Sequence, residues 1–173
     1  MQAPFFWKQV TMDTTDFLPR IAQLLESEAI RFAVIGGQAV NAYVDPLVSL
    51  DLDLAVAADQ VARLEVLLGK DFKVERYPHS LNVSAAGSAL RVQIQTDPRY
   101  SDFVQRASRR TVLGVTLPVG DVRDVLQGKV WAAQDPERRP SKRLKDLADI
   151  ARLVEGYPEL RLSVPADIQS RLT

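Results

Sequence analysis

Apolar residues recur along this chain at spacings that predict a succession of helices and strands. Phe17, Ile21 and Leu25 follow helical spacing and predict an amphipathic helix over residues 15–29. The apolar run 31–35 predicts a short buried strand. The further elements are expected, in chain order, as a short helix over 38–44, a strand over 50–56, a helix within 57–70, strands over 72–77, 81–85 and 89–95, a turn with a short helix within 96–108, a strand pair or bent strand within 111–119, and helices over about 119–134 and 141–155.

The order of these elements predicts the fold class. Helices and strands alternate in the first part, several strands follow one another, and two helices come last. Such an order is typical of an α/β (α+β) fold with a mixed β-sheet flanked by helices. A length of 173 residues suits one domain. We therefore expect a single domain over residues 1–173, with a core at about 15–117 and a C-terminal helical pair at about 119–155.

Composition and charge narrow the classes of function. Lysine and arginine together number 22, as do aspartate and glutamate, so the net charge is zero and no overall field attracts nucleic acid. The chain has no cysteine, which excludes disulfides and thiolate metal sites. No apolar run reaches the roughly 18 to 20 residues of a membrane span, and the N-terminus lacks the features of a signal peptide. We expect a cytoplasmic protein with no membrane partner.

Two aspartates stand one residue apart in the predicted strand 50–56. Because side chains alternate across a strand, Asp51 and Asp53 project to one face, while Leu52 and its apolar neighbours fill the other. Adjacent carboxylates repel each other unless a cation lies between them, and Mg²⁺ is commonly held by one or two carboxylates together with substrate phosphates. The pair indicates a metal site, although a solvated strand face also explains two such aspartates.

The glycines ahead of the pair add a second feature. Gly36 and Gly37 stand where the predicted strand passes into the predicted helix, and small residues there let a phosphate approach backbone N–H groups. A tight turn explains two glycines equally well. The whole succession of strand, Gly-Gly, short helix, Ser49 and Asp-x-Asp is more specific, because it places a phosphate site shortly before a metal-binding pair.

Residues 34–56, VIGGQAVNAYVDPLVSLDLDLAV, resemble the signature of the nucleotidyltransferase (polymerase-beta-like) superfamily. In that signature a hydrophobic strand, Gly-Gly or Gly-Ser and a short helix precede Asp-x-Asp on the next strand. Residues 126–153 are similar to the two-helix tail of AbiE-type nucleotidyltransferases, the toxin class of some bacterial toxin–antitoxin pairs. The matching positions are Lys129, Ala132, Arg138 or Arg139, Lys145, Asp146 and Asp149. The resemblance extends from about residue 30 to about residue 155.

This resemblance implies a nucleotidyltransferase-like mixed sheet and roles for particular residues. Asp51 and Asp53 would be catalytic ligands of Mg²⁺ or Mn²⁺. The residues that would bind the nucleotide are Gly36, Gly37, Ser49, Lys129, Lys142 and Lys145. A solvated helix face is the alternative interpretation for each lysine.

The chain departs from the superfamily pattern at one catalytic position. The pattern has a third carboxylate on a later strand, and here Gln93 occupies that position within LRVQIQTD. An amide oxygen can coordinate a metal, but it brings no charge and cannot act as a general base. Arg91 on the same face would further disfavour a second cation if it points inward. The AbiE-type pattern also places an arginine shortly before the pair, and DPLVSLDLDL has none.

The resemblance implies transfer of a nucleoside monophosphate from an NTP to an RNA or protein hydroxyl, by the toxin of a pair with an antitoxin partner. A catalytically impaired module that binds a nucleotide or a partner protein is the alternative that Gln93 favours. A third hypothesis is an antibiotic-modifying enzyme, which should show an acidic cleft instead of basic rims.

The remaining candidates favour structural interpretations. His79 is the only histidine, which excludes a zinc site built on several imidazoles. We expect Trp131 and Tyr157 to be packing residues. Two basic clusters are expected to be solvated surface, with guidance of an RNA or nucleotide as the alternative: Arg138, Arg139, Lys142, Arg143 and Lys145, and Arg106, Arg109 and Arg110.

Overall fold

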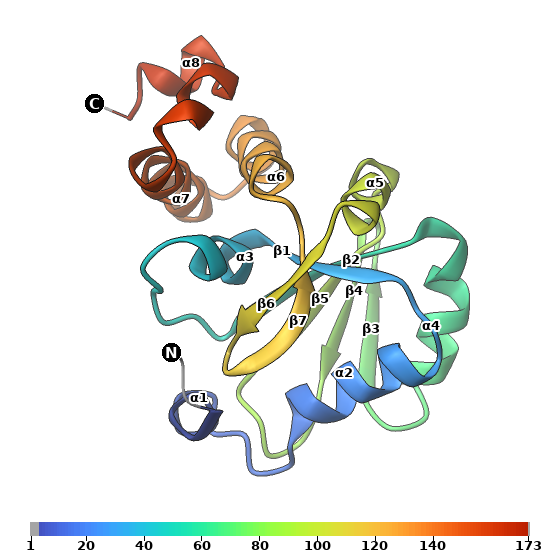
Figure 1. Ribbon diagram of the computed structural model, residues 1–173. Coiled ribbons are helices and arrows are strands. Elements are labelled where there is room, and N and C mark those ends of the chain that lie inside the picture. The colour runs from blue at the N-terminus through green and yellow to red at the C-terminus, as the bar shows by residue number, and fades with distance from the viewer. Residues whose placement is uncertain (1–3, 173) are drawn as a thin grey trace.

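The computed structural model describes residues 4–172, which form a seven-stranded sheet with helices on both faces (Figure 1). The strands are β1 (Phe32–Ile35), β2 (Asp51–Val56), β3 (Lys73–Tyr77), β4 (Ser80–Ser84), β5 (Arg91–Gln95), β6 (Ser108–Val112) and β7 (Val115–Val119). The helices are α1 (Pro4–Val10), α2 (Phe17–Ser27), α3 (Gly36–Tyr43), α4 (Val61–Leu68), α5 (Ser101–Gln105), α6 (Val122–Gln134), α7 (Pro140–Gly156) and α8 (Ala166–Gln169), with 3-10 helices η1 (Ala58–Gln60), η2 (Pro98–Tyr100) and η3 (Pro158–Ser163).

The sheet is mixed, which confirms the predicted fold class. Its strands follow the order β3-β4-β5-β2-β1-β7-β6. The pairs β2–β5 and β1–β7 are parallel, and the other neighbours are antiparallel. The strand pair expected within 111–119 is the hairpin of β6 and β7, although β6 begins earlier, at Ser108. Its two turn residues, Leu113 and Gly114, have φ of 51° and 79°, and a type I′ hairpin turn requires positive φ at both.

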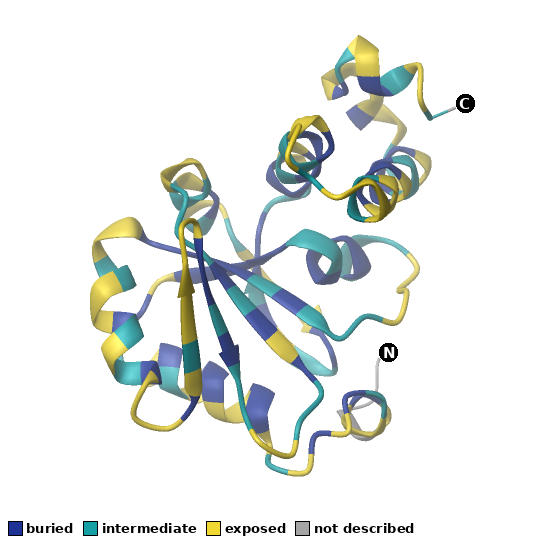
Figure 2. Ribbon diagram, turned by 180° about the vertical axis from the view of Figure 1, so that it is seen from behind, coloured by how far each residue is buried: buried dark blue, intermediate teal, exposed yellow. Residues whose placement is uncertain are grey.

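The two faces of the sheet carry different helices, with α2 and α4 on one side and α3, α5 and α6 on the other (Figure 1). The amphipathic pattern of α2 and α4 buries Phe17, Ile21 and Leu64 in the main core. Figure 2 shows that the central strands are mostly buried and that the edge strand β3 is largely exposed. The apolar side of β2 faces the core, so its polar side faces the helices of the other layer.

Several boundaries differ from the sequence prediction. The helix expected over 38–44 begins at Gly36, so the two glycines form its first turn instead of preceding it. The helix expected over 15–29 is the shorter α2, and the helix within 57–70 is divided into η1 and α4. The short helices α1 and α8 were not predicted. No helix within residues 4–172 combines the length and the apolar character that a membrane span requires.

Candidate functional site

Asp51 and Asp53 lie on one face of β2 and line a cleft of about 440 Å³. Leu52 and Leu54 alternate with them and are each only 1% exposed, on the opposite face. The floor of the cleft comes from the central strands, and its other walls come from α5, α6 and α7. The strand alternation thus brings both carboxylates into one cavity.

Gly36 makes room for the second aspartate. Its φ is +67°, a region that L-residues with a side chain rarely adopt. A Cβ at this position would collide with Asp53 Oδ2 and would lie 3.1 Å from Asp53 Cβ. At Gly37 the nearest atom to an added Cβ is Asp149 Oδ2, at 3.9 Å, which is ordinary contact. Only the first glycine is therefore required by the packing of the carboxylate pair.

The surroundings of Asp53 disfavour its ionised form. Burial, together with the neighbouring charge of Asp51, raises the pKa of Asp53 to about 6 in spite of the opposing effect of Lys129, Arg138 and Lys142. A carboxylate in this state gains stabilisation from any cation that reaches it. The local electrostatics therefore favour a bound cation at Asp53.

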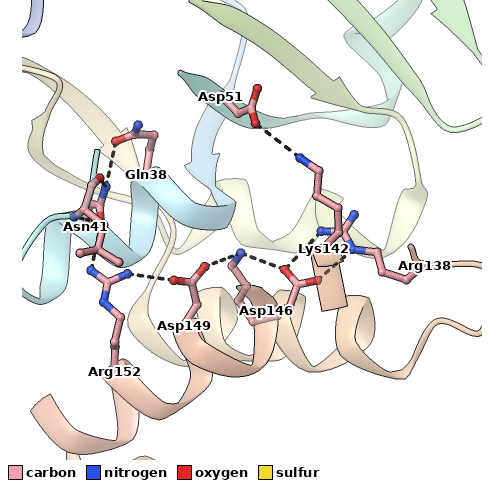
Figure 3. Close-up of polar contacts among 10 residues, drawn as sticks. Gln38, Asn41, Asp51, Arg138, Lys142, Asp146, Asp149 and Arg152 are labelled. Carbon is pink, nitrogen blue, oxygen red and sulfur yellow. Dashed lines mark hydrogen bonds and ion pairs between the residues drawn. The ribbon is translucent and has the colours of Figure 1, made fainter. Parts of the chain in front are cut away.

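Asp51 is held by two cationic side chains from different elements. Arg91 Nε donates a hydrogen bond of 2.7 Å to Asp51 Oδ1, from the neighbouring strand β5. Lys142 Nζ lies 3.6 Å from Asp51 Oδ2, from the first turns of α7 (Figure 3). Arg91 therefore points inward, and both oxygens of Asp51 have a positively charged neighbour.

A buried network of charges joins α6 to α7 beside the cleft (Figure 3). Lys129 Nζ lies 3.1 Å from Asp146 Oδ1 and 2.7 Å from Asp149 Oδ2. Arg138 Nε donates to Asp146 Oδ2 at 2.9 Å, and Arg152 Nη1 donates to Asp149 Oδ1 at 2.8 Å. Each of the two aspartates thus contacts two cations, as buried carboxylates require.

The charge of Lys129 is compensated within the chain. Burial lowers its pKa, but the charges and hydrogen bonds of Asp149 and Asp146 outweigh this effect, and the pKa is raised above its ordinary value. Lys129 lines the cleft, yet its ammonium group is engaged with two carboxylates. Its positive charge therefore serves the packing of α6 against α7.

A second, smaller pocket of about 80 Å³ adjoins the aspartate pair on the side of α3 and α7. It contains Gly37, Ser49, Lys142 and Lys145. Lys145 is exposed, while Ser49 Oγ accepts a hydrogen bond of 3.3 Å from the backbone N–H of Asp51. Of the six residues expected to bind the nucleotide, all except Gly36 line this pocket.

Three polar residues that the sequence analysis missed fix the loop between α3 and β2 (Figure 3). Asn41 Nδ2 donates to the carbonyl of Leu47 at 2.7 Å, and Asn41 Oδ1 accepts from Leu47 N at 3.0 Å and Arg152 Nη2 at 3.0 Å. Gln38 Nε2 donates to the carbonyl of Ser49 at 3.0 Å. The available signal was the helical i, i+3 spacing of Gln38 and Asn41 inside an apolar helix.

Gln93 stands beside the second aspartate. The parallel register of β2 and β5 pairs Asp53 with Gln93, and the next strands continue the row with Asn82 and then Glu75. All four line the cleft. Within residues 4–172 no group of three or more His, Cys, Asp or Glu side chains is arranged to hold a metal ion. The position next to Asp53 therefore carries a neutral amide and no charge.

The basic clusters and the aromatic candidates are largely occupied by contacts within the chain. Arg106 donates to Asp124 at 2.8 Å, Arg109 donates to Glu26 at 3.1 Å, and Arg110 lies 4.0 Å from the centroid of the Tyr43 ring. Trp131 stacks on Phe103 with ring centroids 5.6 Å apart, and Tyr157 packs edge-on against Tyr43 at 6.0 Å. These contacts favour the structural interpretations of both sets of residues.

The chain has an α/β fold whose mixed sheet presents a carboxylate pair beside a glycine turn. Its architecture is the nucleotidyltransferase-like fold, as comparison with solved structures shows. ANT(2'')-Ia in complex with adenylyl-2''-tobramycin matches with a TM-score of 0.61 at 14% identity, over 96% of this chain and 99% of that chain.

Two further solved structures share the fold. The lincosamide antibiotic adenylyltransferase LnuA, bound to lincomycin, matches with a TM-score of 0.54 at 13% identity, over 82% of this chain and 98% of that one. An antigenic nucleotidyltransferase-like protein from Paracoccidioides brasiliensis gives 0.53 at 21% identity, over 92% and 87%. No protein-family profile and no curated protein sequence matches the chain. At these identities the likeness establishes the fold.

Proposed function

We propose that this protein binds a nucleoside triphosphate with Mg²⁺ or Mn²⁺ and transfers the nucleoside monophosphate to a hydroxyl group. The observation that carries the proposal is the pair Asp51 and Asp53 in the cleft, packed against a glycine that no other residue can replace without a collision. The shared fold supports it, because one similar structure contains adenylyl-2''-tobramycin and another is an adenylyltransferase.

The carboxylate pair fits one divalent cation. Asp51 and Asp53 supply two charged oxygen ligands, and the raised pKa of Asp53 reflects a charge that no neighbouring cation fully compensates. The amide oxygen of Gln93 is a neutral third candidate on the adjacent strand. Bound there, the cation would neutralise and orient the transferring phosphoryl group.

The smaller pocket on the α7 side would hold the β- and γ-phosphates. Lys142 and Lys145 would offset their charge, and the backbone at Gly37 opens the first turn of α3 toward the same pocket. Lys142 would then exchange its contact with Asp51 for one with a phosphate. Positioning and charge compensation of this kind are most of what a phosphoryl-transfer protein supplies.

The acceptor hydroxyl would find no general base at the Gln93 position, because an amide does not accept the proton. The proton of the hydroxyl would pass to solvent in the open cleft. Transfer is therefore expected to be slow at neutral pH and to accelerate as the hydroxide concentration rises.

Isothermal titration calorimetry tests the binding step directly. A non-hydrolysable analogue of each NTP, titrated with Mn²⁺ present, should bind the natural chain, and the double variant Asp51→Asn with Asp53→Asn should lose the metal-dependent part of the affinity. Asp71→Asn, at an exposed position outside the cleft, is the matched control. Absence of binding for all four nucleotides would overturn the proposal.

A module that binds a nucleotide or a partner protein without catalysis is the second candidate, and Gln93 with the Arg91–Asp51 contact favours it. Gln93→Asp restores the missing carboxylate beside Asp53. A gain of metal affinity or of transfer activity in this variant would show that the geometry for catalysis is intact. An inactive variant that still binds the nucleotide would favour the binding module.

The AbiE-type resemblance extends the proposal to a cytoplasmic toxin with an antitoxin partner and an RNA or protein acceptor. Most arginines of the two basic clusters are engaged within the chain, as with Arg106, Arg109 and Arg138. Copurification with a partner encoded nearby would support the toxin assignment. The class of molecule that accepts the nucleotide depends on the residues that line the cleft.

A further inference from the structure

We propose that the cleft over β5, β4 and β3 is the acceptor compartment and that the acceptor is a small neutral or cationic molecule rich in hydroxyl and N–H groups. This inference rests on the proposed nucleotidyl transfer. It concerns the part of the cleft that continues from Asp53 through Gln93 and Asn82 to Glu75.

The in-line geometry of phosphoryl transfer indicates which group lies on each side of the aspartate pair. In phosphoryl transfer the attacking and leaving oxygens lie roughly in line through the phosphorus. The smaller pocket, which contains Lys142 and Lys145, lies on the α7 side, and these two lysines suit the leaving pyrophosphate. The attacking hydroxyl then enters from the opposite side of the reacting phosphorus, where Gln93 and the rest of the row lie.

The register of four strands builds the row that would receive this molecule. Asp53 pairs with Gln93, Gln93 with Asn82, and Asn82 with Glu75, so the four side chains share one face of the sheet. With neighbouring strands about 4.8 Å apart, the row spans about 14 Å. That length suits a molecule of two or three rings with its reactive hydroxyl at Asp53.

One atom of the row lacks a partner within the chain. Asn82 Oδ1 is shielded from solvent and accepts no hydrogen bond from the described residues, although it lines the cleft. Buried polar atoms are nearly always hydrogen-bonded, so Asn82 Oδ1 is expected to accept from a donor on a ligand once the side chain turns to present this covered oxygen to the cleft. The O–H or N–H group of an acceptor molecule is such a donor.

The charges along the row disfavour an anionic polymer. The cations that line the cleft are Arg91, Lys129, Arg138 and Lys142, and all of them contact Asp51 or Asp146. The row itself ends at Glu75, whose carboxylate contacts Lys73 Nζ at 2.8 Å, so the row adds no uncompensated positive charge. The facing wall adds Tyr100 and Phe103, whose rings can cover the face of a sugar or similar ring. An RNA strand binds chiefly through cations at its phosphates. A volume of about 440 Å³ is that of a small-molecule site.

The transfer step balances without a further reagent. The hydroxyl oxygen of the acceptor forms a bond to the α-phosphorus of the NTP, and the α–β phosphoanhydride bond breaks. Pyrophosphate leaves with the bonding electron pair, and the hydroxyl proton goes to solvent water. The products are the nucleotidylated acceptor and pyrophosphate.

The test supplies the protein with a mixture of the four α-³²P-labelled NTPs, Mg²⁺ and one of three acceptor pools: a bacterial metabolite filtrate below 1 kDa, total RNA, or total protein. Label should enter the filtrate pool alone. Asn82→Leu should reduce that transfer at least tenfold, with the affinity for Mn²⁺ and an NTP analogue unchanged within twofold and the melting temperature not lowered. Gln127→Leu, an exposed amide on α6 outside the cleft, is the control and should leave transfer unchanged.

Label in RNA or in polypeptide would overturn the inference and favour the toxin-type acceptors. Equal transfer by Asn82→Leu and the natural chain would overturn the role of the row. If no pool is labelled while the NTP analogue still binds, transfer itself is wrong and the binding module remains. If the analogue does not bind, the proposed function itself is wrong, whatever the acceptor.

Discussion

Replacing Asp53 by Asn in the metal-free protein should raise the free energy of unfolding at neutral pH. The pKa of this carboxyl is raised from 3.8 to about 6, because burial and the charge of Asp51 disfavour its ionised form. A pKa difference of one unit corresponds to about 1.36 kcal/mol, so ionising Asp53 in the folded state costs on the order of 3 kcal/mol more than in the unfolded chain. Asn has nearly the same shape and carries no charge, so its substitution removes this cost.

The sign of the pH dependence follows from the direction of the shift. Between about pH 4 and pH 6 the folded protein holds the Asp53 proton more tightly than the unfolded chain, so this group makes the unfolding free energy fall as pH rises. Below that window both states are protonated and the stabilising effect of Asp53→Asn should vanish. Above pH 6 the effect should be complete.

Urea denaturation followed by circular dichroism, with EDTA present, measures this difference at pH 4 and pH 7.5. Asp71→Asn, an exposed aspartate outside the cleft, should show little change at either pH. A variant that is less stable than the natural chain at pH 7.5, or a difference that is the same at both pH values, would refute the reasoning. Addition of Mn²⁺ should then stabilise the natural chain and not the variant.

Three further substitutions test the contacts around the pair. Arg91→Gln removes the guanidinium 2.7 Å from Asp51, which competes with a metal ion for this carboxylate. The affinity for free Mn²⁺, measured by electron paramagnetic resonance, should rise severalfold. An unchanged affinity would show that Arg91 does not compete with the metal. Gly36→Ala should lower the free energy of unfolding, measured by urea denaturation, by about 2 kcal/mol or more, because of the φ of +67° and the collision with Asp53. A decrease below about 0.5 kcal/mol would show that the backbone relaxes. Lys129→Met leaves two buried aspartates with one cation each, and should destabilise the protein by about 3 to 5 kcal/mol; a melting temperature equal to that of the natural chain would show that the network is dispensable.

The pattern of the sequence predicted those parts of the fold that depend only on residues close to one another along the chain. The alternation around Leu52 predicted a strand with its aspartates on one face, and the turn at Gly114 allowed the hairpin of β6 and β7. The glycine pair at the end of β1 was placed at the strand-to-helix junction, although its inclusion in α3 was missed. These features follow from side-chain period and from φ preferences, which a sequence displays directly.

Contacts between segments far apart in the sequence were harder to predict. Nothing near Lys129 in the sequence shows that Asp146 and Asp149 compensate its charge, because that depends on how α6 and α7 pack. The position of Gln93 beside Asp53 was expected from the resemblance, but its continuation to Asn82 depends on the register of β4 with β5. The short helices α1 and α8 carry too few residues for a periodic pattern.

The most direct measurement of the proposed site is a crystal structure with a non-hydrolysable NTP and Mn²⁺, with the metal located by its anomalous scattering. We predict one Mn²⁺ bound by carboxylate oxygens of Asp51 and Asp53, with the triphosphate directed toward Lys142 and Lys145. Arg91 and Lys142 should have moved away from Asp51 in that complex. A nucleotide bound elsewhere, or a complex with no metal at the two aspartates, would contradict the proposed function.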